Sequence, residues 1–138
     1  MTARDFLVLD THLLVWREFY ASAKSDPVAS IVGMLSRLNG FAERFNTRHI
    51  AFTFDVPPYT RLKLFSDYKK REPKEPELQE ALDATTKRIY QLHKILPELG
   101  FKNVLHEDGL EADDTMARVV AGLTGEDRSI LVSEDQDL

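Results

Sequence analysis

Four carboxylates lie within seven positions of the stretch DGLEADD, residues 108–114: Asp108, Glu111, Asp113 and Asp114. Like charges this close repel, and each disfavours ionisation of the others. Asp113 stands three residues before Met116 and seven before Val120, so it shares the apolar face of the helix expected here. A carboxylate on that face needs a partner, and the sequence places no Lys or Arg beside it. We interpret the cluster as oxygen ligands for a hard divalent cation such as Mg²⁺.

Other acids directly follow the remaining apolar runs of the chain. Taken singly, Asp10 and Asp55 are typical of turn residues or helix N-caps, and Glu111 is typical of a first helical turn, where it favours the macrodipole. In an open parallel sheet, however, the carboxyl ends of all strands meet at one edge, where ligands bind. We therefore expect one metal site. Its expected ligands are Asp10, Asp55, Glu111, Asp113, Asp114, Asp135 and Asp137.

The strands that must position these acids are four short runs rich in β-prone residues. They occupy residues 6–9, 49–54, 103–105 and 129–132. Apolar residues recur at helical spacing between them, over residues 28–45, 76–100 and 112–123. Strands that alternate with helices are typical of βαβ units. The sequence therefore predicts an α/β fold, a three-layer sandwich whose central sheet is mainly parallel and carries the acidic site at the carboxyl ends of its strands.

A segment of opposite charge follows Asp55. Residues 57–74 carry six basic residues against two acidic ones, with Tyr59, Phe65 and Tyr68 interleaved. A charge run alone is most often a solvated loop, but cations and ring faces together suit the phosphates and bases of a nucleic acid. The net charge of −5 becomes positive once the seven expected ligands are set aside, and bound cations would reverse the potential of the site.

Composition excludes several kinds of chemistry. The chain has no cysteine, so disulfides, thiolate metal sites and cysteine nucleophiles are ruled out. Four histidines scattered along the sequence argue against a zinc site, and no Gly-rich phosphate loop is present. With 138 residues, no long apolar run and no signal-peptide pattern, we expect one cytoplasmic domain without a membrane segment.

The motifs LVLDTHLLVWREFYA, FDVPPYTRLKLFSDYKKREP, EADDTMA and SEDQDL, in this order, resemble the N-terminal PIN-like (resolvase-like) catalytic domain of the 5′–3′ exonucleases and flap endonucleases. That family includes the 5′ nuclease domain of bacterial DNA polymerase I and phage 5′ nucleases. The resemblance covers nearly the whole chain and implies one such domain over residues 1–138. It also implies that the seven acids surround a divalent-metal centre.

The same resemblance implies roles for the basic segment. Residues 57–76 would contribute to an arch or clamp over a single-stranded 5′ end, with Lys69 close to the scissile phosphate. Lys69 and Arg61 are the expected catalytic cations. The expected DNA contacts are Arg61, Lys63, Tyr68, Lys69, Lys70 and Arg71.

Two motifs depart from the family pattern. The family often has Tyr-Lys-x-x-Arg-Pro, whereas here Arg71 stands one place early and Glu72 takes the usual Arg position. The last motif commonly reads Asp-Lys-Asp, and here Gln136 replaces the Lys. The family also continues with further Asp ligands and a helix-hairpin-helix element. Because the sequence stops at Leu138, we expect the front part of a catalytic domain.

The expected reaction is hydrolysis of DNA phosphodiester bonds assisted by Mg²⁺ or Mn²⁺, with two ions that activate a water and stabilise the leaving oxygen. The expected partner is DNA with a single-stranded 5′ end or flap. Two alternatives remain open: a PIN-type ribonuclease with a similar acid cluster, and a DNA-binding module of this fold without activity. Small PIN ribonucleases usually lack the long basic and aromatic insertion that follows Asp55 here.

Overall fold

A computed structural model describes residues 3–21, 26–67 and 74–133 of the protein. Its centre is a four-stranded sheet in which every strand runs parallel to its neighbours, in the order β3-β2-β1-β4. The strands are β1 (Asp5–Asp10), β2 (His49–Thr53), β3 (Asn103–Leu105) and β4 (Arg128–Val132). The helices are α1 (Thr11–Ala21), α2 (Pro27–Arg44), α3 (Arg61–Leu64), α4 (Pro76–Glu98) and α5 (Ala112–Gly122).

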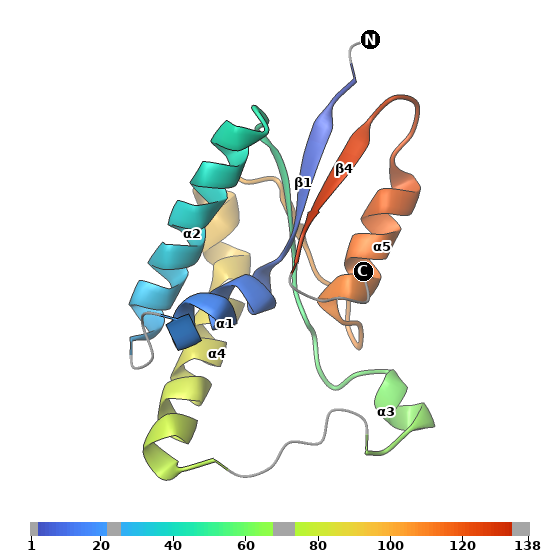
Figure 1. The fold of residues 1–138 in the computed structure, drawn as a ribbon. Coiled ribbons are helices and arrows are strands. Elements are labelled where there is room, and N and C mark those ends of the chain that lie inside the picture. Colours follow the sequence, from blue (N-terminus) through green and yellow to red (C-terminus); the bar gives the residue numbers. More distant parts are fainter. Residues whose placement is uncertain (1–2, 22–25, 68–73, 134–138) are drawn as a thin grey trace.

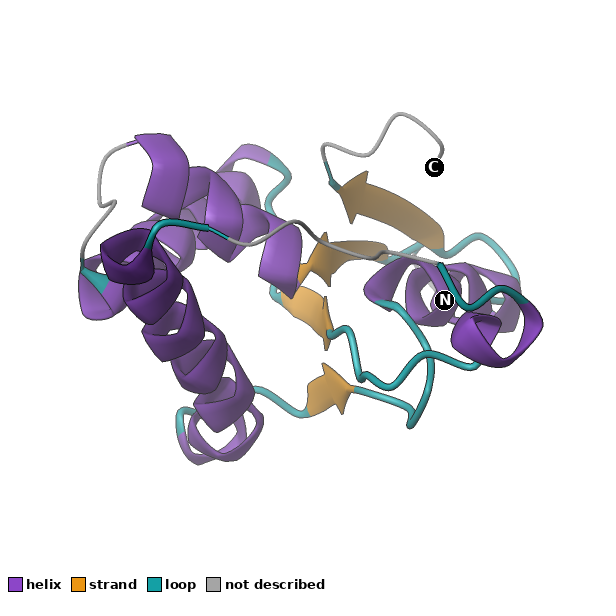
Figure 2. Ribbon diagram, turned by 90° about the horizontal axis from the view of Figure 1, so that it is seen from below, coloured by secondary structure: helices purple, strands orange, loops and turns teal. Residues whose placement is uncertain are grey.

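Helices cover both faces of the sheet. Helices α1, α2 and α4 lie on one side and α5 lies on the other (Figures 1 and 2). The predicted three-layer α/β sandwich with a parallel sheet is therefore confirmed. The predicted strands and long helices all form, with ends within two residues of those expected from the sequence. Two elements, α1 and the short α3, were not predicted.

The side chains of the strands alternate between two apolar clusters, as the two-residue period of a strand requires. Leu7 and Leu9 of β1 pack into the larger cluster, with residues from α1, α2 and α4. Val8, between them, faces the other way and packs with Ala51 of β2 and Met116 of α5. Burial on both faces explains why the central strands β1 and β2 are continuous apolar runs. The larger cluster fixes three helices, and the smaller one fixes the helix that follows the acidic stretch.

The chain order reverses beside β1. The chain moves outward from β1 to β2 and β3, then returns through α5 to β4 on the opposite side of β1. Ligands of open α/β sheets bind at such a reversal, outside the carboxyl ends of the strands. Helix α3 lies beyond the carboxyl ends of the strands, below α5 in Figure 1. Among the described helices, none is long and apolar enough to cross a membrane.

Candidate metal centre

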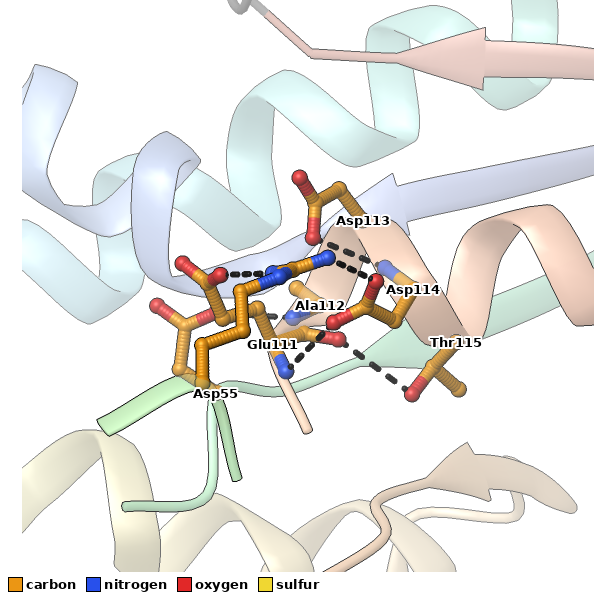
Figure 3. Close-up of polar contacts among 7 residues, drawn as sticks. Asp55, Glu111, Ala112, Asp113, Asp114 and Thr115 are labelled. Carbon is orange, nitrogen blue, oxygen red and sulfur yellow. Dashed lines mark hydrogen bonds and ion pairs between the residues drawn. The ribbon is translucent and has the colours of Figure 1, made fainter. Parts of the chain in front are cut away.

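Three acids come together where α5 begins. Carboxylate oxygens of Glu111, Asp113 and Asp114 all lie within 4.8 Å of one another, which is within the spacing of ligands around one metal ion. Glu111 is buried, with 4% of its surface exposed, while Asp113 and Asp114 are partly buried. Figure 3 shows the three side chains grouped around the first turn of the helix. The structure thus brings together three of the seven predicted ligands.

Local helix chemistry explains why these three acids share one turn. Glu111 is the N-cap of α5, with extended backbone angles, and Asp113 and Asp114 follow in the first turn. Asp114 accepts a hydrogen bond of 3.2 Å from the backbone N–H of Glu111 through Oδ2. Asp113 accepts one of 2.8 Å from the backbone N–H of Asp114. The first N–H groups of a helix have no partner within the helix, so carboxylates are stable here.

Asp55 joins the same helix terminus from β2. One oxygen of its carboxylate accepts a hydrogen bond of 2.7 Å from the backbone N–H of Ala112 (Figure 3). Its backbone carbonyl accepts a hydrogen bond of 3.1 Å from the hydroxyl of Tyr90 on α4. Asp55 is therefore held from both faces of the sheet, beside Glu111.

Asp10 lies on the same edge but is not part of the three-acid cluster. It ends β1 in register with Thr53, two residues before Asp55. Its carboxylate accepts a hydrogen bond of 3.1 Å from the backbone N–H of Leu13, in the first turn of α1. Asp10 thus caps α1, and Asp55 accepts a hydrogen bond from the N-terminus of α5, whereas Glu111 is the N-cap residue of α5 and not, as the sequence suggested, a residue of its first turn. A capping carboxylate still has oxygen lone pairs for other partners.

The turn after β2 is bonded directly to the loop that precedes α5. The N–H of Val56 donates to the carbonyl of Leu110 at 2.9 Å, and the N–H of Gly109 donates to the carbonyl of Val56 at 3.0 Å. Thr60 N–H donates to Gly109 at 2.8 Å. Gly109 has a φ of +80°, which favours glycine, and a Cβ there would lie 2.5 Å from Thr60 Oγ1. The backbone hydrogen bonds tie the residue before α3 to the loop that leads into the acidic cluster.

The partner of the acidic cluster is Arg61, the first residue of α3. Its guanidinium makes an ion pair with Glu111 and a second, of 2.5 Å, with Oδ1 of Asp114. The sequence placed Arg61 among the catalytic and DNA-binding cations, but gave no sign of these two contacts. The cation that pairs with Glu111 and Asp114 thus comes from a segment 50 residues away in sequence. Asp113, for which the sequence required a partner, accepts a hydrogen bond from the backbone N–H of Asp114 instead.

Negative charge in the cluster exceeds the positive charge that Arg61 supplies. The pKa of Asp113 is raised above its ordinary value, chiefly by burial and then by the neighbouring charges of Asp114 and Glu111. The hydrogen bond from Asp114 N–H and the charge of Arg61 oppose this shift but do not cancel it. A further positive charge near Asp113 would stabilise its ionised carboxylate.

The remaining predicted residues divide into two groups. Lys63 lies on α3 and is exposed, as are its neighbours Leu64 and Phe65. The others lie outside the described residues: Tyr68, Lys69, Lys70, Arg71, Asp135 and Asp137. Their expected roles stay predictions.

Residues 5–138, nearly the whole chain, match a known protein family. This family is described as the N-terminal resolvase-like domain of 5′–3′ exonucleases. The chain belongs to this family. Among curated relatives, a 5′–3′ exonuclease of Aquifex aeolicus is 29% identical over 98% of this chain and 47% of its own length. The chain therefore spans about half the length of that relative.

Solved structures share the fold of this 5′–3′ exonuclease domain. A T5 protein co-crystallised with metal ions has a TM-score of 0.74 at 22% identity, over 97% of this chain and 50% of the other. A bacteriophage T5 flap endonuclease in complex with DNA and metal ions has a TM-score of 0.67 at 24% identity, over 96% and 50%. The PIN-like fold predicted from the sequence is confirmed.

The sequence reasoning missed a group of histidines beside the centre. Three of the four histidines that are scattered in sequence come close together, at the start of α1, on α4 and after β3. His93 stacks on His106 with ring centroids 4.2 Å apart and planes 4° apart, and His12 contacts Tyr90 on α4. Only the parallel topology, which brings these three segments to one edge, signals the group.

Proposed function

We propose that the chain is the N-terminal part of the catalytic domain of a divalent-metal-dependent 5′–3′ exonuclease or flap endonuclease that hydrolyses DNA. The observation that carries the proposal is the convergence of Glu111, Asp113 and Asp114 within 4.8 Å at the carboxyl edge of the sheet. Membership of the 5′–3′ exonuclease family supports the reaction, and relatives of twice the length support the assignment to part of a domain.

The donor set fits a hard cation. All three clustered groups are carboxylates, and the pKa of Asp113 is raised, first by burial and then by the charges of Asp114 and Glu111. Oxygen donors at modest density suit Mg²⁺ or Mn²⁺, which keep part of their water shell. Glu111, Asp113 and Asp114 would hold the first ion. Asp10, Asp55, Asp135 and Asp137 would complete the site and hold a second ion.

When bound, such ions lower the pKa of a water and stabilise charge on the leaving oxygen of a phosphodiester. The chain itself supplies orientation. The hydrogen bond from Ala112 fixes the carboxylate of Asp55, and the hydrogen bond from Leu13 fixes that of Asp10. Because these carboxylates are held by backbone N–H groups, they need little rearrangement before they act.

The DNA would pass over α3 and the segment that follows it. Arg61, Lys63, Lys69, Lys70 and Arg71 would contact phosphates, with Lys69 neutralising charge on the phosphate that is cleaved. Tyr68 would offer a ring face to a base. The described part of this segment is consistent with that role, since Lys63, Leu64 and Phe65 all face solvent.

The test is a cleavage assay on DNA with a single-stranded 5′ flap, with matched RNA as the competing substrate. We expect cleavage of DNA in Mg²⁺ or Mn²⁺ that is abolished by EDTA and by Glu111→Gln. Cleavage of RNA in preference to DNA would instead indicate a ribonuclease. DNA binding without metal-dependent cleavage, in the chain and in a form extended to the length of its relatives, would indicate a binding module.

A further inference from the structure

Arg61 holds the same carboxylates that the metal centre needs. Its guanidinium contacts Glu111 through Oε2 and Asp114 through Oδ1 at 2.5 Å. The other oxygen of Asp114 is already engaged by the backbone N–H of Glu111. A cation that binds Asp114 through Oδ1, or Glu111 through Oε2, must therefore take an oxygen that Arg61 now holds.

The position of Arg61 is built into the fold. Helix α3 has only four residues and is anchored by the backbone hydrogen bonds that join Val56 and Thr60 to the loop at Gly109 and Leu110. The Arg61 side chain is 44% exposed, whereas the Glu111 side chain is only 5% exposed. A partly exposed arginine can leave the pair and be solvated, while the buried carboxylate cannot remain without a positive partner.

We propose that Arg61 is an internal counter-ion that neutralises Glu111 and Asp114 until a divalent cation displaces it. This inference rests on the proposed metal centre. The guanidinium and the cation repel each other and compete for the same oxygens, so the two occupy the acids in turn. Once displaced, Arg61 stays at the edge of the centre on α3 and faces the phosphates of an incoming strand. Metal binding then frees the guanidinium of Arg61 to contact the substrate.

The competition predicts that loss of Arg61 strengthens metal binding. We expect Arg61→Gln to bind Mn²⁺ about tenfold more tightly, since one positive charge about 5 Å from a divalent cation has roughly this effect even in water-like surroundings. Isothermal titration of Mn²⁺ into the metal-free protein measures the affinity, without any need for catalysis. Without metal, Arg61→Gln should also melt at a lower temperature, because buried Glu111 then lacks its partner.

Two matched variants separate direct competition from a general loss of charge. Lys63→Gln removes a cation from the same short helix as Arg61. Arg128→Gln removes an arginine that pairs with Asp5 at the amino ends of β1 and β4, away from the acidic cluster. We expect both to change the Mn²⁺ affinity by less than about twofold, because exposed charges farther from the ion are screened. An equal effect of Lys63→Gln and Arg61→Gln would overturn the proposal.

A titration of the unmodified protein needs no variant to fold. The guanidinium N–H signals of Arg61, assigned by through-bond correlation to its own backbone amide, should move on addition of Mg²⁺ to the position of a solvated arginine. A signal that stays unchanged while Mg²⁺ binds, or equal Mn²⁺ affinities for Arg61→Gln and the unmodified protein, would refute the counter-ion role and leave the metal centre standing. If no form of the protein binds either metal, the centre itself is refuted together with the inference.

Discussion

The side-chain carboxylate of Asp55 accepts a hydrogen bond of 2.7 Å from the backbone N–H of Ala112, 57 residues later in the chain. One acid thus links the end of β2 to the start of α5 and satisfies an N–H group that the helix itself leaves without a partner. The bond ties the fold of the domain to the geometry of the candidate metal centre, because Glu111 precedes the bonded residue directly.

Asp55 should therefore have separable roles in stability and in chemistry. We expect Asp55→Ala to lower the free energy of unfolding by about 1–2 kcal/mol, the usual cost of losing a cap. Asp55→Asn keeps an oxygen acceptor and should stay within about 0.5 kcal/mol, yet lose metal-dependent cleavage. Urea denaturation in EDTA measures the first effect. Asp108→Ala, which removes an exposed acid of the loop before α5, is the control and should change little. Equal losses for Ala and Asn would contradict this division.

Asp113 should show the opposite effect on stability. Its pKa is raised in the folded state, so its charged form destabilises the fold, and this cost appears as the pH rises through that raised pKa. Asp113→Asn keeps the acceptor for Asp114 N–H but removes the charge. In EDTA at neutral pH we expect the melting temperature to rise by about 2 °C, with the effect limited by solvent exposure.

The same variant should bind Mn²⁺ more weakly and lose metal-dependent cleavage. Asp108→Asn serves as the control for both measurements, since Asp108 is exposed and is not one of the clustered acids. A variant that melts earlier in EDTA and still cleaves would show that Asp113 is a structural residue.

Much of the fold follows from the sequence because its signals are local. The strands are short apolar runs followed by acids, β1 and β2 are largely buried, and α2 begins where Asp26 caps the N–H groups of Val28 and Ala29. Helix α1 was not predicted. Its buried face includes polar Thr11, His12 and Glu18, so the apolar spacing is weak there. Glu18 is neutralised by Arg37 of α2, a partner that only the packed structure supplies.

The candidate site was predictable in composition but not in detail. Strand polarity alone places Asp10 and Asp55 at the same end of the sheet as the start of α5. That Arg61 pairs with Glu111 and Asp114 depends on the turn after β2, on Gly109 and on a contact between segments 50 residues apart. No spacing in the sequence reports such a contact.

The close contact between Gly109 and Thr60 gives a test of how α3 is held. A methyl group at Gly109 would meet Thr60 Oγ1 at 2.5 Å and would also force an alanine to a φ of +80°. Gly125 has a similar φ of +68° but nothing within 4 Å of its added Cβ. We expect Gly125→Ala to cost about 1 kcal/mol from backbone strain alone, and Gly109→Ala to cost about 1–2 kcal/mol more.

Urea denaturation of both variants measures the difference. The double variant Gly109→Ala/Thr60→Ala should recover part of the added loss, because the clashing oxygen is gone. Equal losses for the two glycine variants would show that the loop relaxes and that the contact does not fix α3.

The stacked pair of His93 and His106 predicts a loss of stability in mild acid. The pKa of His93 is lowered from 6.5 to about 4, first by burial and then by the charges of His106 and His12. Its Nε2 is buried and has no hydrogen-bond partner among the described residues. Tyr90 also faces the ring, with centroids 5.9 Å apart. Protonation would place a charge between these groups, where little in the described structure stabilises it.

The direction of this pH effect follows from the pKa of His93 in the unfolded chain and in the folded chain. Between pH 6.5 and about 4 the unfolded chain binds a proton that the folded chain refuses, so stability is complete above pH 6.5 and declines as the pH falls toward 4. We expect His93→Gln to make the decline shallower by less than the one-proton limit of about 1.4 kcal/mol per pH unit, because the ring is partly exposed. Urea titrations at several pH values in EDTA measure the slopes. His49→Gln, at an exposed position on β2 outside the stacked group, is the control and should change the slope less than His93→Gln does. Parallel slopes for His93→Gln and the unmodified protein would mean that the stack does not carry the acid sensitivity.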